Sequence, residues 1–131
     1  MHRQKRVSMG KRILYIEDNP DNRMLIRRVL VAEGYVVEEA FDGNLGLQQA
    51  AASPPDLILI DINLPEIDGY EVTARLKQLP DLTGVPIIAV TANVMKGDRE
   101  KTLAAGCDGY IQKPIDVDLL PSQIESFLKK E

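Results

Sequence analysis

The most informative stretch of the 131-residue chain is Asp56-Leu57-Ile58-Leu59-Ile60-Asp61-Ile62-Asn63. Its apolar run, residues 57–60, has no polar face, which predicts a strand buried on both sides. Strands of this kind occur in parallel sheets that carry helices on both faces. Asp61 follows the run directly, so we expect its carboxylate at the carboxyl edge of such a sheet.

Other apolar runs alternate along the chain with segments of helical periodicity. Strands are predicted at 13–16, 36–37, 57–60, 85–90 and 110–111. Helices are predicted over 20–33, 69–79 and 117–129, with weaker patterns over 43–52 and 95–105. Five strand–helix pairs without a linker predict one α/β domain, a doubly wound parallel sheet of five strands. Tyr15 and Tyr35 are expected to pack in its core.

Charge is unevenly spread over the chain, whose formal net charge is −4. Residues 1–12 hold five Lys or Arg and no acid, which leaves 11 basic and 20 acidic groups in the rest. We expect residues 1–10 to form a flexible basic tail and residues 11–131 to form the domain. The acidic body argues against direct DNA binding, which needs cations that neutralise phosphates.

Several kinds of protein are excluded by composition. No apolar run exceeds four residues, far short of a membrane span. Cys107 and His2 are the single cysteine and the single histidine, so an internal disulfide and a Cys/His zinc site are excluded. A cytoplasmic protein is the expectation.

Polar side chains follow four of the predicted strands, at the edge where doubly wound sheets bind ligands. They occur in Glu17-Asp18-Asn19, Asp61-Ile62-Asn63, Thr91-Ala92-Asn93 and Lys113-Pro114. Three acids without His or Cys form an all-oxygen site that suits Mg²⁺. Asp61 can act as a nucleophile and become an aspartyl phosphate. Lys113 and Thr91 can then contact phosphoryl oxygens.

Taken together, these motifs resemble the receiver domain of two-component response regulators, the chemotaxis-regulator fold. The matching stretches are 13–19, 56–65, 68–69, 86–92 and 109–114, and the resemblance covers about residues 10–130. It implies a flavodoxin-like (βα)5 sheet with strand order 2-1-3-4-5. It also implies a phospho-accepting switch of a phosphorelay.

The resemblance implies a role for each motif residue. Asp61 would be the phosphoacceptor. Asp18, Asp61 and the backbone carbonyl of Asn63 would bind Mg²⁺, with Glu17 assisting directly or through water. The phosphate-binding and switch residues would be Thr91, Ala92, Lys113 and Tyr110, with a cis peptide between Lys113 and Pro114.

The resemblance also implies partners. The phosphodonor would be a sensor histidine kinase or a histidine phosphotransfer protein. A downstream protein target would bind the surface formed by 95–105, 110–111 and 117–129. The chain would be a stand-alone regulator, a monomer or weak phosphorylation-dependent dimer, with weak autophosphatase activity and no other enzyme activity. Asn63 and Asn93 would border the path of the attacking water.

Three alternatives remain open at this point. The first is a Mg²⁺-dependent hydrolase of the haloacid-dehalogenase type, although that family expects its nucleophile on the first strand, whereas Asp61 follows the third. The second is a flavodoxin-like cofactor binder, which Glu17 and Asp18 disfavour because they would repel phosphate. The third is a receiver excised from a hybrid histidine kinase.

Overall fold

Strands and helices alternate along the chain, as the periodicity predicts. The structure, a computed structural model, describes residues 10–92 and 96–129. Within these residues the strands are β1 (Arg12–Ile16), β2 (Val36–Ala40), β3 (Leu57–Asp61), β4 (Ile87–Thr91) and β5 (Gly109–Gln112). The helices are α2 (Pro20–Ala32), α3 (Gly43–Ala52), α4 (Gly69–Lys77), α5 (Lys96–Ala104) and α6 (Leu120–Leu128), with a short 3₁₀ helix, η1 (Pro80–Leu82).

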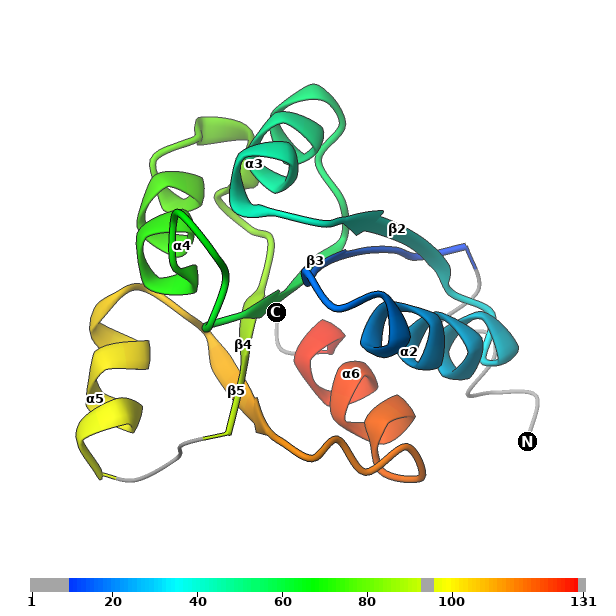
Figure 1. Cartoon of the computed structure of the whole chain (residues 1–131). Helices are drawn as coiled ribbons and strands as arrows, with labels where there is room; N and C mark the ends of the chain where they lie inside the picture. The colour runs from blue at the N-terminus through cyan, green and yellow to red at the C-terminus, as the bar shows by residue number, and fades with distance from the viewer. Residues whose placement is uncertain (1–9, 93–95, 130–131) are drawn as a thin grey trace.

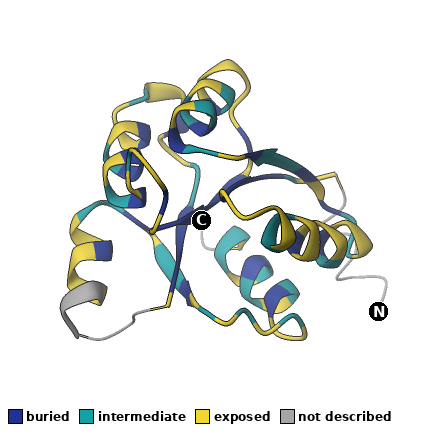
Figure 2. Cartoon of the chain, viewed as in Figure 1, coloured by how far each residue is buried: buried dark blue, intermediate teal, exposed yellow. Residues whose placement is uncertain are grey.

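The five strands form one parallel sheet in the order β2-β1-β3-β4-β5, which confirms the predicted fold and strand order. Figure 1 shows α2 and α6 side by side next to the sheet, away from α3 and α4. Every residue of β3 and of β4 is buried (Figure 2). The central strand is therefore covered on both faces, as its unbroken apolar run requires.

Side chains alternate between two apolar clusters because successive residues of a strand point to opposite faces. Ile13 and Tyr15 of β1 pack with α2 and α6, in the cluster that also holds Ile124. Leu14 and Ile16 pack in the other cluster, with α3, α4 and η1. This two-sided packing fixes the register of the strands and thereby the positions of the residues at their ends.

Helix starts follow the capping residues in the sequence. The side chains of Asn19 and Asp68 accept hydrogen bonds from backbone N–H groups in the first turns of α2 and α4. Pro20 occupies the first turn of α2, as expected of a residue without an N–H donor. Each helix start lies just beyond the carboxyl edge of the sheet, so the caps also order the loops of that edge.

The last helix differs from its prediction over 117–129. It begins at Leu120, because Asp116 Oδ1 accepts from the backbone N–H groups of Asp118 and Leu119 and holds a separate turn there. Pro121 lies in the first turn of the helix that follows. The predicted basic tail lies, apart from Gly10, outside the described residues. No helix among the described residues has the length and hydropathy to cross a membrane.

Candidate functional site at the carboxyl edge of the sheet

The register brings the predicted site residues to one edge. Ile16 pairs with Ile60, so the next residues along β1 and β3 are Glu17 and Asp61. Thr91 ends β4 and pairs with Gln112, the residue before Lys113. Four strands therefore deliver their polar residues at the same level.

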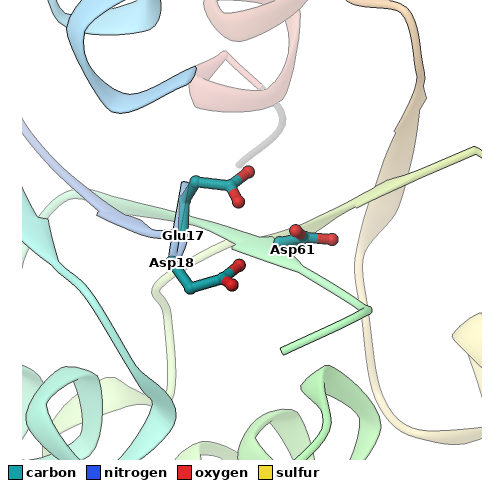
Figure 3. A group of neighbouring side chains, drawn as sticks. All are labelled: Glu17, Asp18 and Asp61. Carbon is teal, nitrogen blue, oxygen red and sulfur yellow. The ribbon is translucent and has the colours of Figure 1, made fainter. Parts of the chain in front are cut away.

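Three carboxylates meet at this edge, from two different strands (Figure 3). One oxygen each of Glu17, Asp18 and Asp61 lies within 4.8 Å of the others. Glu17 and Asp61 are 1% and 2% exposed, whereas Asp18 is exposed. The cluster thus has two buried acids beneath one acid that faces solvent.

Glu17 is held at several points. Its Oε1 accepts from the Tyr15 hydroxyl at 3.0 Å and its Oε2 from the backbone N–H of Asn19 at 3.2 Å. Its backbone carbonyl accepts from Arg23 Nη1 at 2.7 Å. Burial, and next the negative charge of Asp61, raise the pKa of Glu17 to about 7. The first cause is the loss of water around the buried carboxylate, and the second is repulsion by a neighbouring acid.

Lys113 is the cation that faces the cluster. Its Nζ lies 3.1 Å from Asp61 Oδ2 and 4.0 Å from Glu17 Oε1. Its backbone N–H donates to the carbonyl of Thr91 at 2.8 Å, and its peptide bond to Pro114 is cis. One ammonium group faces three carboxylates, so the balance of charge stays negative.

The loop after β3 closes tightly over Asp61. The backbone N–H of Asn63 donates to Asp61 Oδ1 at 3.0 Å, while the Asn63 side chain is exposed. Gly69 donates its N–H to the carbonyl of Ile62 at 2.9 Å. A Cβ atom at Gly69 would lie 2.6 Å from the Asp61 carbonyl oxygen, so only glycine fits this approach.

The remaining predicted residues lie along β4 and β5. Thr91 is 4% exposed at the end of β4, and Ala92 beyond it is exposed. Tyr110 of β5 is half-buried, and the guanidinium of Arg99, from α5, lies 5.8 Å from the centre of its ring. Asn93, predicted to border the water path, lies outside the described residues.

A mostly apolar cavity of about 450 Å³ opens beside Lys113. It is lined by residues of α2 and of the loops after β4 and β5: Asn22, Leu25, Ile26, Ala92, Lys113, Pro114 and Ile115. Leu25 and its neighbour Met24 are 46% and 51% exposed. An apolar surface therefore adjoins the charged site.

Sequence reasoning assigns Tyr15 to packing and overlooks its contact with the site. The ring is packed in the core, but its hydroxyl reaches Glu17. Residues two apart in a strand point to the same face. The spacing between Tyr15 and Glu17 is thus the signal that could have revealed the contact.

The donor set fits a hard divalent cation. Carboxylate oxygens are the ligands that Mg²⁺ prefers, and the described part of the cluster offers no sulfur or imidazole ligand. A cation there would offset the repulsion among three clustered acids. The neighbouring ammonium group of Lys113 adds a contact for an anionic group bound to that cation.

Comparisons with known proteins agree with this site. The family model described as the response regulator receiver domain matches residues 13–125. The chain is 44% identical over 120 residues to the polar-differentiation response regulator DivK of Brucella anthropi, covering 92% of this chain and 98% of DivK.

Solved structures give the same result. The receiver domain of the sensor histidine kinase PA1611 from Pseudomonas aeruginosa, which holds a magnesium ion in its active-site cleft, has a TM-score of 0.84 and 38% identity, with coverage of 91% and 98% of the two chains. The chemotaxis response regulator CheY4 of Vibrio cholerae shares the fold, with a TM-score of 0.87, 24% identity and coverage of 91% and 99%.

The family match spans most of the chain, which supersedes the hydrolase and the cofactor binder as alternatives. The chain therefore belongs to the response regulator receiver domains, the phospho-accepting signalling switches of two-component systems.

Proposed function

We propose that Asp61 is the phosphoacceptor and takes its phosphoryl group from a phosphohistidine on a sensor histidine kinase or a histidine phosphotransfer protein. The observation that carries this proposal is the setting of the Asp61 carboxylate. It is buried, it lies 3.1 Å from Lys113 Nζ, and it is clustered with Glu17 and Asp18.

The reaction is an in-line displacement at phosphorus. A carboxylate oxygen of Asp61 attacks, the P–N bond of the donor breaks, and its electron pair returns to the imidazole nitrogen. The Lys113 ammonium, already beside Asp61 Oδ2, then pairs with a phosphoryl oxygen. The Thr91 hydroxyl and the Ala92 backbone contact the other phosphoryl oxygens.

Asp18, Asp61 and the backbone carbonyl of Asn63 would hold Mg²⁺, with Glu17 in support. Bound Mg²⁺ would supply positive charge that stabilises the arriving phosphoryl group. Two features support this set: the all-oxygen cluster and the loop that the Asn63 N–H ties to Asp61. Glu17, which accepts hydrogen bonds from Tyr15 and Asn19, is the third carboxylate of the cluster.

The signal passes from Thr91 to Tyr110 and on to the surface formed by α5, β5 and α6, which binds a downstream protein. Thr91 moves toward the phosphoryl group, and Tyr110 fills the space it leaves. Phosphorylation thereby shifts the population between two states of this surface. The protein acts in the cytoplasm without binding DNA, as a monomer or a weak phosphorylation-dependent dimer.

The phosphodonor docks over α2. The apolar cavity beside Lys113, which the exposed Leu25 lines, supports this position, and the preceding residue of α2, Met24, is exposed as well. A donor helix that covers these side chains would bring its phosphohistidine to Asp61 and exclude water from the site.

Hydrolysis of the acyl phosphate limits the lifetime of the signal, so the chain has weak autophosphatase activity. Asn63 and Asn93 each lie two positions beyond a site residue in the sequence, Asp61 and Thr91, so we expect both to border the attacking water. An amide orients water without excluding it, which predicts an intermediate lifetime. A bulky cationic replacement such as Asn93→Arg should prolong it.

Acetyl phosphate with Mg²⁺ tests the phosphoacceptor. Wild type should gain one base-labile phosphoryl group by intact mass, and so should the control Asp81→Asn, which changes an exposed acid of η1. Asp61→Asn should gain none, because an amide cannot form an acyl phosphate. Undiminished labelling of Asp61→Asn would overturn the assignment.

A further inference from the structure

One side chain of the apolar core, that of Tyr15, makes a hydrogen bond to the acidic cluster. Tyr15 is the penultimate residue of β1 and is fully buried, in the cluster of Ile26, Leu30 and Ile124. A buried tyrosine needs a partner for its hydroxyl, and here that partner is Glu17 Oε1 at 3.0 Å.

The ring of Tyr15 is an anchor with little freedom. Packing on both sides fixes its plane, and a fixed plane fixes the point at which the hydroxyl emerges toward the carboxyl edge. The same face of β1 carries Glu17 two residues later. The Tyr15 hydroxyl is therefore a rigid donor that reaches one oxygen of the Glu17 carboxylate from the core side.

The other contacts of Glu17 complete a clamp. Oε2 accepts from the backbone N–H of Asn19, the residue that caps α2, and Arg23 binds the Glu17 carbonyl. A carboxylate offers about four acceptor positions, so these two hydrogen bonds leave others for a cation or its water. The clamp fixes where those positions point, which is toward Asp18 and Asp61.

We propose that Tyr15 is a positioning residue of the metal site, whose hydroxyl holds Glu17 oriented toward the cation. This inference rests on the proposed Mg²⁺ site. Partners behind a ligand set commonly matter for affinity, and losing one weakens metal binding by roughly 10- to 100-fold. Because Tyr15 touches Glu17 and not the cation, the lower end, about tenfold, is expected for its hydroxyl.

Tyr15→Phe removes the hydroxyl and keeps the ring. Tyr35→Phe is the matched control, because Tyr35 belongs to the same apolar cluster, is 4% exposed and lies at the amino end of β2. Both variants are titrated with MgCl₂ by isothermal calorimetry at constant ionic strength. Tyr15→Phe should bind about tenfold more weakly than wild type, and Tyr35→Phe should match wild type.

A double-mutant cycle separates positioning from a general loss of structure. In a Glu17→Gln background, Tyr15→Phe should change the Mg²⁺ dissociation constant by less than about twofold, since the carboxylate it positions is gone. The proposal is overturned if Tyr15→Phe binds Mg²⁺ as wild type does, or if it weakens binding equally in both backgrounds. Absence of Mg²⁺ binding by wild type would instead overturn the proposed metal site itself.

Discussion

Asp56 and Asp61 stand at the two ends of β3, and their surroundings are opposite. Asp56, just before the strand, is exposed, and its Oδ2 accepts from the backbone N–H of Arg12 at 2.7 Å. Asp61 ends the strand in a buried position among two further carboxylates and one lysine. The same residue type thus joins neighbouring strands at one edge and gathers charge at the other.

The rest of the amino edge follows the pattern of Asp56. Arg12 binds both carboxylate oxygens of Glu38, at 3.0 and 3.2 Å. Asp108 Oδ2 accepts from the backbone N–H of Ile87 at 2.8 Å and from Lys77 Nζ at 3.0 Å. Each of these charges is matched by an opposite charge or a backbone group, which is the arrangement that stabilises a fold.

The carboxyl edge lacks this matching of charges, and a phospho-accepting site needs the excess of negative charge that results. Excess negative charge should destabilise the fold when no cation is bound, and for the same reason it should favour the binding of the proposed Mg²⁺. Active sites commonly carry such a cost in stability, which the rest of the fold offsets.

The largest expected effect is stabilisation by Mg²⁺. At about 100 times its dissociation constant, Mg²⁺ should stabilise wild type by about 2.7 kcal/mol. Asp18→Ala should lose most of this gain, because the exposed acid is one of the proposed ligands. The control Asp21→Ala, an exposed acid in the first turn of α2, should keep it. Thermal melts with Mg²⁺ or EDTA give the comparison, and an unchanged shift in Asp18→Ala would exclude Asp18 as a ligand.

Next in size is a pH dependence without metal. The folded pKa of Glu17 is raised to about 7 from 4.5. Between these pH values the folded state keeps a proton that the unfolded state has lost, so stability falls as pH rises. The fall should be on the order of 2 kcal/mol. Urea unfolding in EDTA should show this slope flattened in Glu17→Gln and retained in Glu71→Gln, an exposed acid of α4. Equal slopes in all three proteins would contradict the assignment.

A smaller effect is expected at the amino edge. Asp108→Ala leaves the N–H of Ile87 and the Lys77 ammonium without their acceptor, which should cost about 1–1.5 kcal/mol in urea unfolding. Labelling by acetyl phosphate should be unchanged. Loss of labelling in this variant would show that the two edges are not separable.

The smallest effect is expected for Arg99, whose guanidinium lies over Tyr110. Arg99→Ala should cost about 0.5–1 kcal/mol and shift the ring resonances of Tyr110 in NMR spectra. The control Arg75→Ala, which breaks an exposed ion pair with Glu71 on α4, should leave those resonances in place. If the Tyr110 resonances and the stability are both unchanged in Arg99→Ala, the contact between the guanidinium and the ring does not contribute to the stability of the protein.

Periodicity was sufficient to predict the sheet, because a strand such as β3 can be apolar throughout only when both its faces are covered. Parallel pairing then puts Glu17 and Asp61 at one edge without further information. The proximity of their carboxylates follows from topology alone.

Details that depend on side-chain direction could not be predicted in this way. The clamp on Glu17 requires the rotamer of Tyr15 and the cap at Asn19. The late start of α6 reflects a local competition between the turn at Asp116 and the helix pattern that follows it. The contact between Arg99 and Tyr110 joins two elements whose relative position appears only in three dimensions.

The most direct test of the contrast between the edges is the free energy of unfolding of Asp56→Asn and Asp61→Asn, measured by urea in EDTA. Asp56→Asn should be less stable than wild type, because a charge-assisted hydrogen bond to the Arg12 N–H becomes a neutral one. Asp61→Asn should be more stable, because the amide relieves the repulsion with Glu17 and Asp18 while its oxygen can still accept from Asn63. Opposite signs support the account, and a loss of stability in both variants would contradict it.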